Sequence, residues 1–268
     1  MGTLTNMKPN NPIDWPGSPH DYSGDYLLKH CAEEATQRYI PGTRYTTWDG
    51  RVFKYGYSRN ACIGGKGAKN SSNVMNIAQD AAAIAVGDQF ITITLGASDG
   101  YAVDGEVAEN ELIGGYFVSH HPSVQMRGIT ANTGGDAVAI RVYLDAPITL
   151  ADSDPYCEIF LNPYNYLAHA QTGYDYQSTM VVPNNNVTSG RYFWGQSWGP
   201  CQCNPGSDWD SIGDSIGERT VYFVGDGSVN GAVALSGAVD GHQLAGFIID
   251  ETAAASDASP LIMLQISI

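Results

Sequence analysis

Residues 43–57 read TRYTTWDGRVFKYGY, and this stretch indicates the fold class more clearly than any other. Asp49-Gly50 is a favoured two-residue hairpin turn, because a type I′ turn needs positive φ at both central positions. Such a turn predicts an antiparallel hairpin with Trp48 opposite Arg51, Thr46 opposite Phe53 and Arg44 opposite Tyr55. Two of these pairs would let an arginine lie over an aromatic ring.

Most of the remaining chain also has the two-residue period of β-strands. Residues 89–95 read QFITITL and residues 137–144 read AVAIRVYL, where one face of the strand would carry Val138, Ile140, Val142 and Leu144. Further strands are predicted near 112–118, 124–130, 156–161, 178–182, 191–198, 219–224, 243–249 and 261–267. About ten short strands with Gly, Asn, Asp and Pro turns predict a mainly β protein, an antiparallel β-barrel or sandwich with glycine-rich turns.

The N-terminal region differs from the rest. Residues 1–25 are rich in Pro, Asn, Gly and Asp without a hydrophobic period, so they predict an extended arm, which Trp15 would anchor to the body or to a neighbouring subunit. Residues 26–37, YLLKHCAEEATQ, predict one short helix with Asp25 as its cap and an apolar face formed by Leu27, Leu28, Cys31 and Ala35.

The composition changes near residues 165–175, where longer strands give way to short strands between glycine turns. This change predicts four parts. They are an arm over 1–25, a short helix and linker over 26–42, a β domain over 43–170, and a second small barrel-like region over 171–268.

Charge and cysteine content bound the possible partners. The 268 residues carry a formal charge of −15, from 28 acidic and 13 basic residues, so neither nucleic acid nor an anionic membrane is an expected partner. Every apolar stretch falls short of the roughly 20 residues that span a bilayer, and the N-terminus lacks the pattern of a secretion signal. Five irregularly spaced cysteines favour free thiols and assembly in the cytosol.

One motif resembles a catalytic signature. Residues 195–199, GQSWG, match the G-x-S-x-G nucleophile elbow around Ser197, and Asp226 or Asp240 and then His242 follow in the order of a serine hydrolase. That chemistry needs a strand-to-helix turn, whereas here Pro200 and CQCNPGSDW follow the motif. We therefore expect no enzyme activity and keep a hydrolase using Ser197 as a minor alternative.

No metal or cofactor site is predicted. The spacing of Cys201 and Cys203 is too short for a usual zinc site, and no second Cys/His pair stands at ligand distance. His120 and His121 are adjacent, so in a strand they would face opposite sides. Tyrosines 164, 166, 174 and 176 lie among Asn, Gln and Thr, a composition that suits an interface, simple packing or sugar stacking.

Several segments resemble virion structural proteins of tailed bacteriophages, in particular capsid decoration (cement) and other head-associated proteins. In chain order the segments are ATQRYIPGTRYTTWDGRVFKYG, AENELIGGYFVSHH, YLDAPITLADSD, FLNPYNYL, VTSGRYFWGQSWGPC and GHQLAGFIIDETAAASDASPLIMLQISI. Together they fall within residues 35–268, and none carries a catalytic signature.

The resemblance implies a protein that binds the exterior of a capsid after assembly in the host cytoplasm. Its expected partners are the major capsid protein and further copies of itself, as a homotrimer. The alternative that stays open is a receptor- or glycan-binding module of a tail fibre or spike. The candidate interface anchors are Trp15, Trp48, Trp194, Trp198, Tyr164 and Tyr166.

Overall fold

The computed structural model describes residues 32–47, 49–70, 74–76, 83–100, 104–120, 123–136, 138–153, 156–169, 178–206, 219–231, 242–250 and 259–267. Within these ranges the chain forms strands and turns and no helix. The prediction of an antiparallel, mainly β protein is confirmed, with sheets that curl into half-barrels. The predicted arm over 1–25 lies outside the described residues.

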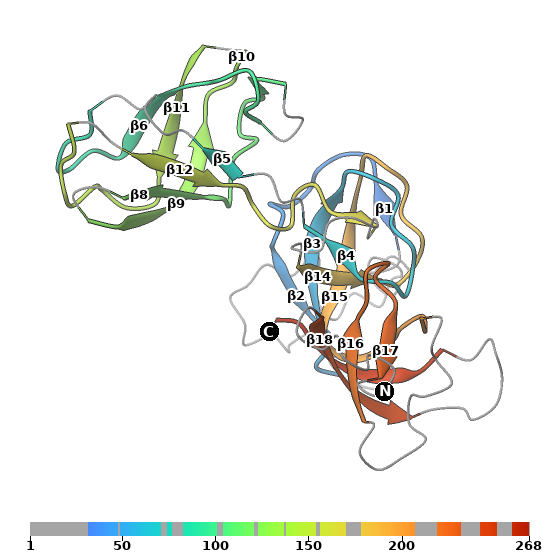
Figure 1. Ribbon diagram of the computed structural model, residues 1–268. Coiled ribbons are helices and arrows are strands. Elements are labelled where there is room, and N and C mark those ends of the chain that lie inside the picture. Colours follow the sequence, from blue (N-terminus) through green and yellow to red (C-terminus); the bar gives the residue numbers. More distant parts are fainter. Residues whose placement is uncertain are drawn as a thin grey trace, which may run out of the picture. The chain divides into compact units, whose positions relative to one another are not determined.

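The chain divides into two compact units, which are labelled by their strands in Figure 1. Unit 1 comprises Met1–Ser71 and Tyr164–Ile268, and unit 2 comprises Ser72–Pro163. Unit 2 is thus an insertion in the sequence of unit 1.

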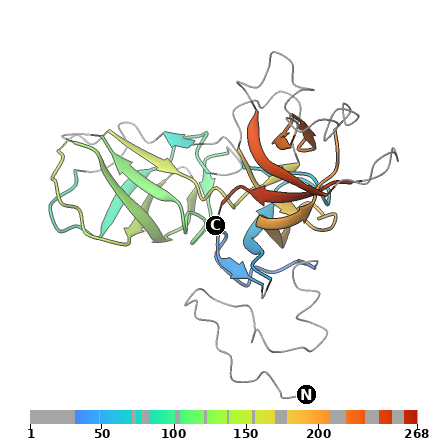
Figure 2. The same ribbon diagram turned by 90° about the horizontal axis from the view of Figure 1, so that it is seen from below.

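Unit 1 contains an eleven-stranded sheet. Its strands are β1 (Glu33–Glu34), β2 (Arg44–Thr46), β3 (Val52–Ser58), β4 (Ala68–Lys69), β13 (Ala168–His169), β14 (Thr179–Pro183), β15 (Arg191–Gln202), β16 (Thr220–Phe223), β17 (Val229–Gly231), β18 (Gln243–Asp250) and β19 (Leu261–Gln265). The main path runs β13-β4-β14-β15-β19-β18-β16-β17. β18 and β19, red in Figure 2, lie side by side.

The long strand β15 joins the parts of this sheet. Residues 191–198 pair with β3, and Trp198–Gln202 pair with β19. Shorter pairings connect β15 to β1 and β14. One side chain cluster on this sheet is aromatic, with buried Tyr45, Phe53, Tyr55 and Trp194.

Unit 2 contains a six-stranded sheet and a two-stranded ribbon. The six strands, in spatial order, are β5 (Val74–Asn76), β12 (Cys157–Phe160), β8 (Tyr116–Ser119), β9 (Gln125–Asn132), β11 (Ala139–Leu144) and β6 (Phe90–Thr94). The ribbon pairs β7 (Glu106–Val107) with β10 (Gly135–Asp136).

The core of unit 2 follows from strand alternation. In β11 the side chains of Ile140, Val142 and Leu144 are buried, as predicted, and they alternate with exposed neighbours. Val138, which was expected on the same face, precedes the strand and is exposed. The same core includes Phe117 of β8 and further residues from β6, β7, β9 and β12.

The hairpin predicted over residues 43–57 is present as β2 and β3, but its predicted register is wrong by one residue. Tyr45 stands opposite Phe53, and the Thr47 N–H donates to the Arg51 carbonyl at 2.9 Å. This bond encloses three residues, so the turn is longer than a two-residue type I′ turn, and of its described residues Asp49 and Gly50 only Gly50 has a positive φ, +85°. A one-residue shift moves every side chain of a strand to the other face. The observed register buries Tyr45 against Phe53.

The predicted helix over 26–37 is wrong for its described part, residues 32–37. Glu33 and Glu34 form β1 and pair with Phe193 and Tyr192 of β15. The Glu33 carboxylate accepts hydrogen bonds from the N–H and hydroxyl of Thr188, at 2.6 and 3.0 Å. These tertiary contacts outweigh the helix propensity of the segment. Residues 26–31 lie outside the described ranges.

The domain division also differs from the predicted one, which placed residues 43–170 in one domain and 171–268 in another. Residues 43–71 belong to the same unit as the C-terminal segment, because β3 pairs with β15 along seven positions. The composition change near 165–175 lies close to the second junction, between Pro163 and Tyr164.

Candidate functional site

Three neighbouring strands of unit 2 bring nine positions to one face of its sheet, and we call these positions the outer face. The register places six of them in two rows across β12, β8 and β9, and the other three continue the same spacing, as a third row, just beyond the strand ends. The rows are Phe160–Tyr116–Gly128, Glu158–Val118–Met126 and Tyr156–His120–Val124. Because alternate residues of a strand share a face, all nine point the same way.

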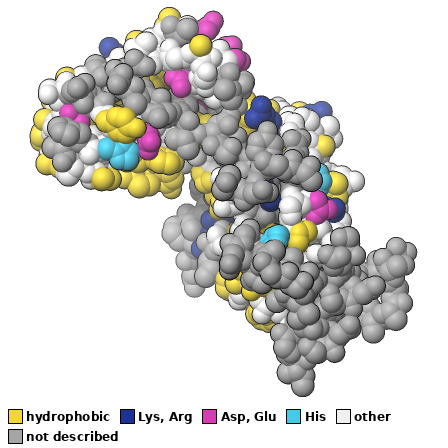
Figure 3. Space-filling model, in the orientation of Figure 1, with side chains coloured by type: hydrophobic (Ala, Val, Ile, Leu, Met, Phe, Trp, Pro, Cys, Tyr) yellow, Lys and Arg dark blue, Asp and Glu magenta, His cyan; other side chains and the backbone are white. Residues whose placement is uncertain are grey.

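Most of the outer face is apolar and accessible. Between 39% and 69% of the surface is exposed for five of its side chains: Tyr116, Val124, Met126, Tyr156 and Phe160. The residues that alternate with them point inward and are buried, as Phe117 and Ile159 show. Figure 3 shows hydrophobic side chains of unit 2, at the upper left, gathered around a histidine and an acidic side chain. A contiguous exposed apolar patch of this kind is typical of an interaction site.

The polar pair within the outer face is His120 and Glu158. His120 Nε2 lies 3.0 Å from Glu158 Oε2, and the His120 ring meets Tyr156 edge-on with centroids 5.5 Å apart. The pair places one carboxylate directly opposite Val118, which is buried, between the exposed apolar side chains of the first and third rows.

Hydrogen bonds fix the position of β9, one of the three strands that carry the outer face. Gln125 is buried, and its side-chain oxygen accepts from the N–H groups of Thr149 and Leu150 at 3.0 and 2.9 Å. Asp145 Oδ1 accepts from the Gly128 N–H at 3.0 Å. A Cβ at position 128 would lie only 2.7 Å from Asp145 Oδ2, so a larger residue would displace this carboxylate. These contacts fix the position of β9 within the sheet that carries the outer face.

The geometry at Ser197 is not that of a nucleophile elbow. Ser197 lies within β15, is fully buried, and donates its hydroxyl to the Ser267 carbonyl at 2.8 Å. Asp226 forms an ion pair with Lys66 at 2.6 Å. Asp240, the other acid considered for a triad, lies outside the described residues.

Four of the five cysteines lie in the described ranges. Cys62, Cys157, Cys201 and Cys203 are buried and free. Burial raises the pKa of the Cys62 and Cys157 thiols to about 12, so both stay protonated at neutral pH. Among the residues that the structure describes, no group of three or more His, Cys, Asp or Glu side chains could hold a metal ion.

The predicted anchors are spread over unit 1. Trp194 is buried among aromatic rings, and its ring centroid lies 5.1 Å from that of Tyr55. Trp198, Tyr164 and Tyr166 are partly exposed. Tyr166 contacts Tyr57, and Arg59 lies over its ring at 5.9 Å. Trp15 and Trp48 lie outside the described residues.

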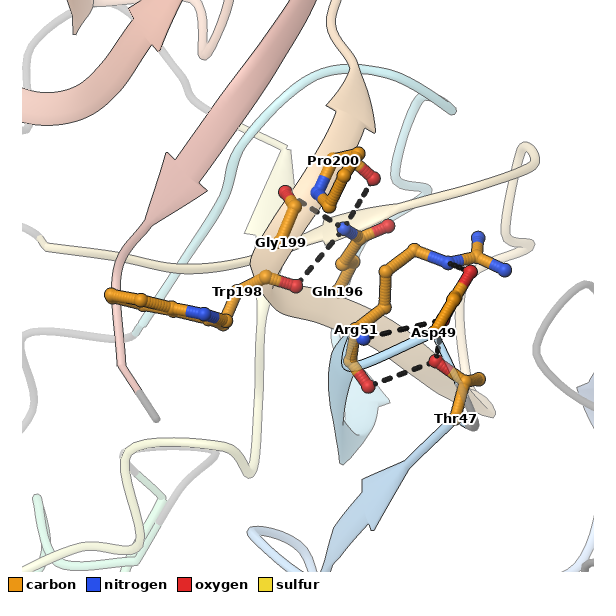
Figure 4. Close-up of polar contacts among 7 residues, drawn as sticks. All are labelled: Thr47, Asp49, Arg51, Gln196, Trp198, Gly199 and Pro200. Carbon is orange, nitrogen blue, oxygen red and sulfur yellow. Dashed lines mark hydrogen bonds and ion pairs between the residues drawn. The ribbon is translucent and has the colours of Figure 1, made fainter.

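In a regular strand Trp194 and Trp198, four residues apart, would share one face, but a bulge separates them. Gln196 stands opposite Phe53 but Trp198 stands opposite Val52, so Trp198 lies on the other face from Trp194. Figure 4 shows the Gln196 amide directed at the carbonyls of Trp198, Gly199 and Pro200, at 3.1, 3.2 and 2.8 Å. The hairpin turn lies nearby, where Asp49 accepts hydrogen bonds from Thr47 and Arg51.

Sequence reasoning missed the outer face. The strands near 112–118, 124–130 and 156–161 were predicted, and part of the signal was in them: Tyr116 and Phe160 alternate with residues that are equally apolar or small, whereas Met126 lies between Gln125 and Arg127. Two apolar faces on one strand indicate either a buried strand or an exposed contact surface, and only the register tells which face is covered.

Comparison with known proteins gives no relative. No protein-family model matches the chain, and no curated protein and no solved structure is similar enough to be matched to it. Within the described residues, no helix is both long and apolar enough to cross a membrane.

Proposed function

We propose that this chain is a structural protein of a tailed-bacteriophage particle and that it decorates or stabilises the capsid through protein–protein contacts. In this proposal the outer face of unit 2 is the contact surface. The major capsid protein is the partner, and further copies of the chain complete the assembly as a trimer on the capsid exterior.

The observation that supports a binding role is the exposure of five large apolar side chains on one sheet face. Interfaces of stable complexes are enriched in Tyr, Phe and Met at their centre, and three of these five are aromatic. The titratable groups of the face are His120, Glu158 and two tyrosines, a set suited to contacts at a protein surface. Several segments resemble decoration proteins in the same order along the chain, and this resemblance suggests the class of partner.

A binding assay with heads assembled without the chain tests the proposal. The full chain is mixed with these heads, and the number of bound copies is measured after sedimentation. We expect saturable binding at hundreds of copies per head. The variant Phe160→Ser/Met126→Ser should bind at least about tenfold more weakly, because both side chains lie at the contact.

The matched control is Phe90→Ser/Val138→Ser. It removes two exposed apolar side chains of the same unit that lie off the outer face, on or near β6 and β11. The control should bind heads as tightly as the unmodified chain. Absence of binding to heads, together with a few copies at a tail tip or specific binding on a glycan array, would support the adhesin instead.

A further inference from the structure

The charge of the chain is divided very unevenly between its two units. Residues 72–163 contain twelve Asp and Glu residues against two arginines and no lysine, a formal charge of −10 of the total −15. Unit 1 contains the remaining eleven basic residues. The unit that carries the outer face is therefore the strongly acidic one.

The two arginines of unit 2 are both engaged in contacts of its own. Arg127 donates to the carbonyls of Met126 and Pro147, at 2.8 and 3.0 Å, and to the Thr149 hydroxyl at 3.2 Å. The Arg141 guanidinium lies over the Phe90 ring, 5.1 Å from its centroid. Neither arginine is one of the nine positions of the outer face.

Carboxylates, by contrast, lie at the outer face. Glu158 is one of its nine positions, and Asp145 contacts Gly128 at the end of the first row. With −10 over 92 residues, the field around this face is negative, so it attracts cationic groups and repels anionic ones.

This charge selects the occupant of the face. Two copies of the outer face placed against each other would bring two units of charge −10 together, and like charges across an interface cost affinity. A partner with an apolar centre and a rim of Lys and Arg matches both properties of the face.

We infer that the outer face docks onto a basic protein surface, in which Lys and Arg side chains surround an apolar patch. This inference rests on the proposed function and adds the chemistry of the partner: the shell surface beneath unit 2 is positively charged. Glu158 and Asp145 meet its cations, while Phe160, Tyr116 and Met126 fill its apolar centre.

Three substitutions at one exposed position test the inference in the full chain. Val124→Glu, Val124→Gln and Val124→Lys each remove the same apolar side chain and differ in charge. Val124 is 69% exposed, so the fold tolerates all three. Binding to heads assembled without the chain is measured in about 50 mM and about 500 mM NaCl, because salt screens exposed charges.

The expected order of affinity is Glu, then Gln, then Lys, with about a tenfold span at low salt that shrinks at high salt. Equal affinities, or tightest binding by the Lys variant, would overturn the basic partner and leave the proposed function standing. Failure of the unmodified chain to bind heads at either salt concentration would overturn both.

Discussion

At the scale of single residues, Gln196 shapes the longest described strand of unit 1. Its side chain is buried, and the two amide hydrogens are shared among three carbonyl oxygens at the bulge of β15. Gly199, directly after the bulge, has φ of +94°, and a Cβ there would lie 3.1 Å from the Arg51 Cα. The bulge lets β15 pair with β3 on one stretch and with β19 on the next.

We expect Gln196→Ala to destabilise unit 1 by about 2–3 kcal/mol, because it leaves buried carbonyls without a donor. Tryptophan fluorescence during urea unfolding measures this, since all five tryptophans belong to unit 1. Gln202→Ala, at an exposed position of the same strand, is the control and should change stability by less than about 0.5 kcal/mol. Equal effects of the two substitutions would contradict the role of Gln196.

Asp226 makes the stability of unit 1 depend on pH in the acid range. Burial alone would raise the pKa of Asp226, but hydrogen bonds from Lys66 and Ser228 outweigh it and lower the pKa from 3.8 to about 2. A carboxylate whose folded-state pKa is lowered stabilises the fold above its unfolded pKa. That contribution is lost as the pH falls through the folded value.

The contribution of Asp226 is therefore complete well above pH 3.8 and disappears as the pH approaches about 2. We expect Asp226→Asn to be less stable than the unmodified chain at neutral pH, with a difference that shrinks over this acid range. Urea unfolding at a series of pH values measures both proteins. A difference that stays constant down to about pH 2 would show that the carboxylate charge contributes nothing.

At the scale of elements, the pairing of β18 with β19 depends on Gly246. Its φ is +149°, and a Cβ would lie 1.8 Å from the Met263 carbonyl oxygen. Gly246→Ala should therefore separate the two strands and cost about 2–4 kcal/mol in unfolding free energy. Gly225→Ala is the matched control, because nothing lies within 4 Å of a Cβ there. Equal unfolding free energies for the Gly246→Ala and Gly225→Ala variants would contradict this packing.

Alternation predicted the strands well and their pairing less well. Ile140, Val142 and Leu144 mark the buried side of β11 because their neighbours are polar or small. The hairpin register depends on turn geometry at Gly50, and a shift of one residue is invisible in the alternation of TRYTTWDGRVF. The helix predicted over the residues of β1 was wrong because β1 pairs with residues 158 or more positions away, and local sequence does not show such a pairing.

At the scale of the whole molecule, unit 2 enters and leaves unit 1 through two paired strands. β4 precedes it and β13 follows it, with Lys69 opposite Ala168 and Ala68 opposite His169. The described segments that lead into and out of unit 2 therefore lie side by side in unit 1. Composition along the chain showed only the second junction, because a discontinuous unit is defined by pairing between distant segments such as β3 and β15.

This arrangement predicts that unit 2 can be removed. A chain lacking residues 72–163 joins Ser71 to Tyr164 and turns β4 and β13 into a hairpin. We expect this chain to fold and to lose binding to heads. Tryptophan fluorescence should show a single cooperative unfolding transition. A deletion variant without such a transition would show that unit 1 depends on unit 2 for its stability.

We propose above that the outer face of unit 2 holds the chain on a particle. A cryo-electron microscopy map of heads carrying the chain tests this most directly. We expect density for hundreds of copies, with Tyr116, Met126 and Phe160 buried against a neighbouring protein. Copies whose outer face points into solvent, or heads without any such density, would contradict it.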